Sequence, residues 1–63
     1  MNKPKRIIYL QKGSYPIHAV IVDGIAEVRA KKHLLCYYEI KNQEILYSVP
    51  GLPIQLLVKL QAL

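Results

Sequence analysis

The sequence holds few of the residues on which catalytic sites and disulfide scaffolds depend. Among its 63 residues there are one cysteine, Cys36, and two serines, and threonine, tryptophan and phenylalanine are missing. A lone cysteine excludes an intrachain disulfide and a cysteine-based zinc site. The scarce hydroxyls show no Ser-His-Asp spacing, and the scattered glycines form no phosphate-cradling loop. We therefore expect no catalytic residue, no metal site, no cofactor and no enzymatic activity.

Acidic residues are also few, because four Asp and Glu stand against nine Lys and Arg, which gives a net charge of +5. Four acidic residues offer few candidates for a pair of catalytic carboxylates. The basic surplus favours an anionic partner such as nucleic acid, an acidic protein or an anionic membrane surface. The alternative is that the charge only keeps a small apolar domain soluble.

Long hydrophobic runs are missing as well. The apolar run from Ile7 to Leu10 is too short for the core of a signal peptide. No segment approaches the ~20 apolar residues that a membrane span requires. The sequence predicts a cytoplasmic protein without a membrane span.

Short runs of Ile, Val, Tyr and Leu are abundant, and this composition is typical of strands. Turn signals separate these runs at residues 12–16, 23–24, 42–43 and 50–53. We expect residues 1–5 to form a basic, flexible tail and residues 6–63 to form a single domain.

The Asp23-Gly24 pair predicts a hairpin with a two-residue turn, in which Val22 pairs with Ile25. This register places only apolar residues on one face, which is not expected by chance. The predicted inner residues of this first hairpin are Ile17, Ala19, Ile21, Ala26, Val28 and Ala30.

A second hairpin is predicted with its turn at Asn42-Gln43, so that Lys41 pairs with Glu44. Residues 54–62 alternate in polarity and predict a final strand, although the spacing of Leu56, Leu60 and Leu63 also fits a helix. The predicted inner residues of the second hairpin are Leu34, Cys36, Tyr38, Ile40, Ile45, Tyr47 and Val49.

Together these elements predict an all-β fold, a small barrel of five or six short antiparallel strands. The order of strands, with a Pro-Gly-x-Pro corner before the last one, resembles an SH3-like barrel over residues 6–60. The peptide-binding SH3 domains use a Trp-containing groove that this chain lacks, so the resemblance implies no recognition of Pro-rich peptides. The alternative fold is α+β, with a helix at about 25–36, where Ala26, Ala30 and Leu34 share a helical face.

Two groups of cations, one within the first twelve residues and one at residues 29–33, are candidates for contact with phosphates, since each Lys or Arg on a phosphate releases condensed counterions. Tyr9, Tyr15 and Tyr37 offer surfaces on which unpaired bases can stack. The first functional hypothesis is therefore a non-catalytic module that binds nucleic acid. Its predicted contact residues are Lys3, Lys5, Arg6, Lys12, Arg29, Lys31, Lys32 and Tyr37.

The outer face of the first hairpin carries adjoining apolar residues, namely Val20, Val22 and Ile25. A contiguous β-branched patch at a surface usually belongs to an interface. The second hypothesis is therefore a protein-interaction or assembly module, or an accessory subunit, that uses this patch to bind a protein partner or to form a homo-oligomer.

Overall fold

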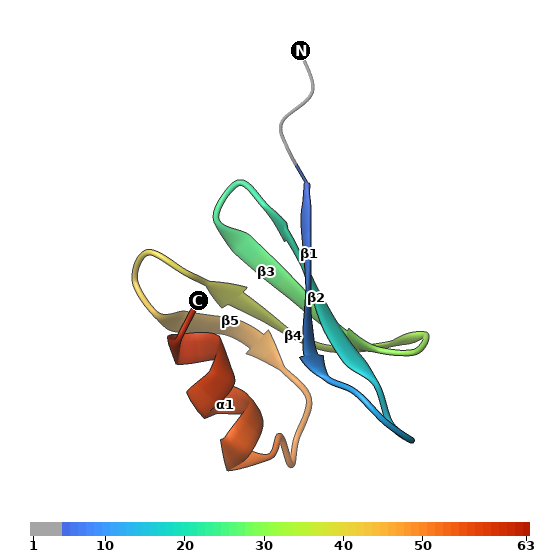
Figure 1. Cartoon of the computed structure of the whole chain (residues 1–63). Coiled ribbons are helices and arrows are strands. Elements are labelled where there is room, and N and C mark those ends of the chain that lie inside the picture. The colour runs from blue at the N-terminus through green and yellow to red at the C-terminus, as the bar shows by residue number, and fades with distance from the viewer. Residues whose placement is uncertain (1–4) are drawn as a thin grey trace.

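The chain folds into one antiparallel sheet with a single helix on one of its faces (Figure 1). The computed structural model describes residues 5–63, so Lys3 and most of the predicted tail lie outside the described residues. The strands pair in the order in which they follow along the chain. The elements are β1 (Arg6–Gln11), β2 (Ile17–Val22), β3 (Ile25–Ala30), β4 (His33–Glu39), β5 (Glu44–Ser48) and α1 (Ile54–Gln61).

The sheet is open, with β1 and β5 as its two edges. The antiparallel strands are confirmed, but closure into an SH3-like barrel is not, because β1 and β5 do not pair with each other. The segment expected to supply the final strand forms α1 instead. We call the side of the sheet that α1 covers the inner face, and the opposite side the outer face.

The hairpin of β2 and β3 has the predicted register, with Val22 opposite Ile25 across a two-residue turn. Asp23 (φ 57°) and Gly24 (φ 76°) both have positive φ, as a type I′ turn requires. The alternative helix at 25–36 is wrong, because this span forms β3, a turn and the start of β4. All six residues predicted to point inward are buried: Ile17, Ala19, Ile21, Ala26, Val28 and Ala30.

The hairpin of β4 and β5 has a different register from the predicted one. Glu39, rather than Lys41, lies opposite Glu44, so the connection spans residues 40–43. The backbone N–H of Ile40 donates a hydrogen bond to the carbonyl oxygen of Gly24 (3.0 Å), which takes Ile40 out of the ladder. A β-bulge then shifts the pairing again, and Ile45 and Tyr47, both predicted to be inward, are 39% and 50% exposed.

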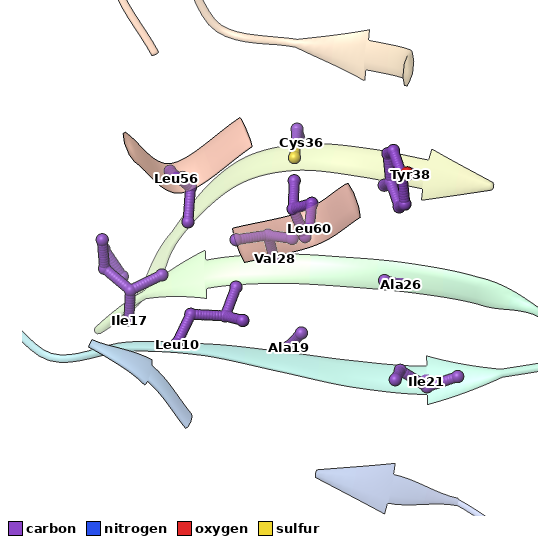
Figure 2. Close-up of a cluster of buried hydrophobic side chains, with 11 residues drawn as sticks. Leu10, Ile17, Ala19, Ile21, Ala26, Val28, Cys36, Tyr38, Leu56 and Leu60 are labelled. Carbon is purple, nitrogen blue, oxygen red and sulfur yellow. The ribbon is translucent and has the colours of Figure 1, made fainter. Parts of the chain in front are cut away.

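Helix α1 replaces the final strand that was predicted for residues 54–62. A strand would bury Ile54 and Val58 together with Leu56 and Leu60, whereas Ile54 is 75% exposed and Val58 is 60% exposed. Leu56 and Leu60, one helical turn apart, are both buried. Figure 2 shows both side chains reaching the inner face, where Leu60 lies near Val28 and Cys36. The core is therefore formed between one helical stripe and the inner face of the sheet.

The amine of Lys59 ties α1 to the edge of the sheet by donating a hydrogen bond to the carbonyl oxygen of Leu10 (2.7 Å). In the part of the chain that the structure describes, no helix is long and apolar enough to cross a membrane.

Candidate nucleic-acid interface

The topology sorts the connecting loops between the two ends of the sheet. Because neighbouring strands are antiparallel, the loop after β1 (residues 12–16) and the turn after β3 (residues 31–32) lie at the same end, at the lower right of Figure 1. The turn after β2 and the loop after β4 lie at the opposite end. One end of the sheet therefore collects residues that are far apart in the sequence.

Cations gather at the first of these ends. Lys12 comes from the loop after β1, Lys31 and Lys32 come from the turn after β3, and all three are exposed. Arg29 lies near the end of β3, and His33 opens β4. We call this group the basic end, formed by Lys12, Arg29, Lys31, Lys32 and His33.

The acidic side chains lie elsewhere. Asp23 is in the turn after β2, and Glu39 and Glu44 flank the loop after β4, so these three are at the opposite end of the sheet. Glu27 lies in the middle of β3, where its carboxylate accepts hydrogen bonds from Nε (3.0 Å) and Nη2 (2.6 Å) of Arg29. The positive charge of Arg29 is thus largely neutralised by Glu27, and the positive potential of the basic end comes mainly from its three lysines.

Exposed aromatic rings border the basic end. Tyr9, which is 64% exposed, lies opposite His18 on the outer face, with ring centroids 6.3 Å apart and planes inclined at 51°. His18 in turn lies opposite Arg29. Tyr15 projects from the loop after β1 and is 48% exposed. Aromatic faces beside cations are the combination on which unpaired bases stack.

A cavity of about 330 Å³ lies where the loop after β1 faces the corner at residues 49–53. This volume is at the low end of ligand pockets, which span about 300–1,000 Å³. The side-chain amide of Gln11 donates a hydrogen bond to the carbonyl oxygen of Tyr15 (2.7 Å) and so holds the loop beside the cavity. The other lining residues are mostly apolar: Tyr15, Ile17, Leu35, Val49, Pro50, Gly51, Leu52 and Pro53.

The predicted contact residues lie at two different ends of the sheet. Lys12, predicted to act with the N-terminal cations, lies instead at the same end as Arg29, Lys31 and Lys32. Lys5 and Arg6 lie at the start of β1, which is the opposite end of the sheet.

Tyr37 is also outside the basic end. It lies on the outer face between Glu27 and Tyr47, and its ring centroid is 6.3 Å from that of Tyr47. Sequence reasoning did not place the pairing of Tyr9 with His18, nor the cavity, because both depend on the bulged end of β1 and on the corner after β5.

Cys36 lies in the core on β4, apart from the basic end. Cys36 is fully buried, and burial raises the pKa of its thiol, which keeps the thiol protonated and unreactive. Within residues 5–63, no three His, Cys, Asp or Glu side chains come together as they must to hold a metal ion.

Comparison with protein-family models, with curated proteins and with solved structures found no match for this chain.

Proposed function

We propose that this protein is a non-catalytic module that binds single-stranded nucleic acid at its basic end. The observation that carries the proposal is the uneven distribution of charge along the sheet. Three exposed lysines from two loops lie at one end, where Glu27 is already paired with Arg29. At the other end, Asp23, Glu39 and Glu44 are offset by Lys5, Arg6 and Lys41. A polyanion is therefore attracted more strongly to the first end than to the second.

The proposed contacts divide into two kinds. Lys12, Lys31 and Lys32 contact backbone phosphates and release counterions, which supplies most of the affinity. Tyr9 and Tyr15 offer exposed rings on β1 and on the loop after it, and bases stack on such rings without regard to sequence. A duplex hides the faces of its bases, so single strands are the preferred ligand.

The test is fluorescence anisotropy of labelled single-stranded and duplex oligonucleotides at several salt concentrations. For single strands, each lost phosphate contact lowers the slope of log K against log salt by about 0.7. We expect the double substitution Lys31→Ala and Lys32→Ala to lower the slope by about 1.4 and to weaken binding at physiological salt.

The matched control removes the same charge from the opposite end, with Lys5→Ala and Lys41→Ala, and its slope should stay close to that of the wild type. If the two double variants lose affinity equally, binding follows net charge alone and the basic end is not the site. Binding that is detected only at low salt contradicts the proposal as well.

A second function, protein interaction through the outer face, is favoured by a separate observation. Ile7 is 55% exposed and Val22 is 37% exposed on that face, beside the half-buried Val20 and Ile25. Isolated exposed apolar residues are ordinary, but a contiguous group of this kind marks a contact surface.

A further inference from the structure

The aliphatic residues of the outer face form one patch. Ile7 on β1 lies opposite Val20 on β2, and Val22 on β2 lies opposite Ile25 on β3. Because alternate residues of a strand share a face, Val20 and Val22 also adjoin along β2. We call these four residues the aliphatic patch, and it lies toward the end of the sheet away from the basic end.

Charges flank the aliphatic patch asymmetrically. Lys5 immediately precedes β1, at the first edge of the sheet. Glu39 and Glu44 lie opposite each other on β4 and β5, at the second edge and at the same end of the sheet. At this end of the outer face, the charge is therefore positive at the β1 edge and negative at the β5 edge. The aliphatic patch lies between the positive and the negative side chains.

We propose that a second copy of this chain covers the aliphatic patch, face to face, about a two-fold axis that runs along the strands. The inference rests on the second function above and names its partner. Such an axis places β1 over β5 of the second copy, and β2 over its β4. Lys5 then faces Glu44 of the second copy, while Ile7 faces its Tyr47 and Val20 its Tyr37. Two sheets packed in this way, with their strands nearly aligned, form a sandwich.

An axis across the strands is less favourable. Passing through the middle of the strands, it would place Val22 over His18 of the second copy and Ile25 over its Arg29, so that apolar side chains would strip water from a cation. The axis along the strands keeps cations off the aliphatic patch. It places Ile25 over its own copy and Val22 over Glu39 of the second copy, whose carboxylate already accepts a hydrogen bond from Asn42 (2.7 Å). Near that axis, Glu27 lies close to Glu27 of the second copy, and Arg29 lies close to its Arg29. Within each chain these two side chains form an ion pair (2.6 Å), so like charges do not meet unneutralised.

The size of the outer face places the dimer among small interfaces, the size class of weak and transient encounters. Five strands about 4.8 Å apart and about six residues long, at about 3.4 Å per residue, cover about 480 Å² in projection. The two copies together then bury on the order of 1,000 Å², the lower limit for a specific interface. We expect a dimer that dissociates on dilution through the micromolar range.

The first test is sedimentation velocity of the full chain between 5 and 500 µM, about the range that such an interface implies. Wild type should convert from monomer to dimer, and Val22→Glu should remain monomeric at every concentration. The control is Val58→Glu, the same substitution at an exposed position of α1 on the other side of the molecule, which should dimerise as wild type does. Circular dichroism confirms that both variants are folded.

A charge exchange tests the direction of the axis. Lys5→Glu and Glu44→Lys should each weaken the dimer, because each places like charges opposite one another, and the two together should restore it. A monomeric wild type, a dimeric Val22→Glu variant, or a combined variant weaker than either single one would overturn the inference.

The dimer and the nucleic-acid site can fail separately. The Val22→Glu variant keeps the basic end and should still bind oligonucleotide. The Lys31→Ala, Lys32→Ala variant keeps the aliphatic patch and should still dimerise. Loss of both properties in either variant would show that the two surfaces are not distinct.

Discussion

At the scale of single residues, Cys36 shows how the fold removes reactivity from a side chain. It lies on β4 and is fully buried within the core that α1 completes. Thiolate is the reactive form, and burial raises the pKa of this thiol, so the folded protein contains little thiolate at neutral pH.

We therefore expect a thiol reagent such as dithionitrobenzoate to label Cys36 no faster than the protein unfolds. The measurement is the labelling rate at pH 8 with and without denaturant, and the unfolded chain serves as the fully reactive control. Immediate labelling of the folded protein would contradict the burial described here.

At the scale of elements, the fold depends on α1, because its two buried leucines, Leu56 and Leu60, cover the inner face, with Leu52, Leu57 and Leu63 packed against the same core. Leu60→Ala should lower the free energy of unfolding by about 2–5 kcal/mol, as expected for a large-to-small change in a core. Val58→Ala, on the exposed side of the same helix, should change it by no more than about 0.5 kcal/mol. Thermal unfolding followed by circular dichroism compares the two variants, and equal melting temperatures would show that α1 is not docked by Leu60.

The elements also show how far the sequence determines the fold. The hairpin of β2 and β3 was predicted to the residue, because a two-residue turn fixes the register. The register of β4 and β5 was missed because Ile40 bonds to Gly24, a tertiary contact that local pattern does not reveal. The apolar residues of α1 fit the period of a strand as well as that of a helix. Which of the two forms depends on which leucines pack against the sheet, and this contact is not visible in the local sequence.

At the scale of the whole molecule, function follows from how the antiparallel order distributes side chains. Sequence reasoning grouped Lys12 with Lys5 and Arg6, which the structure places at the other end of the sheet. Counting strand reversals along the chain would have corrected this grouping. The aliphatic residues Val20, Val22 and Ile25 were recognised correctly as outward, and the pairing of β1 with β2 added Ile7 to them.

The prediction of a barrel also concerns the whole molecule. Closure was expected to need a final strand at residues 54–62, and this segment forms α1 instead. With α1 on the inner face, the sheet formed within residues 5–63 keeps two free edges, and no other element of those residues covers its outer face. The outer face is a second surface, separate from the basic end, and we propose a different partner for each.

The most direct test of binding at the basic end is an NMR titration of the ¹⁵N-labelled protein with a single-stranded oligonucleotide at physiological salt. We expect backbone amide shifts to change at residues 12–18 and 29–35, the loops and strand ends that form the basic end. Amides at residues 22–25 and 39–44 should stay in place. Shifts confined to those latter segments, or no shifts at a several-fold excess of oligonucleotide, would contradict the assignment of the basic end as the binding site.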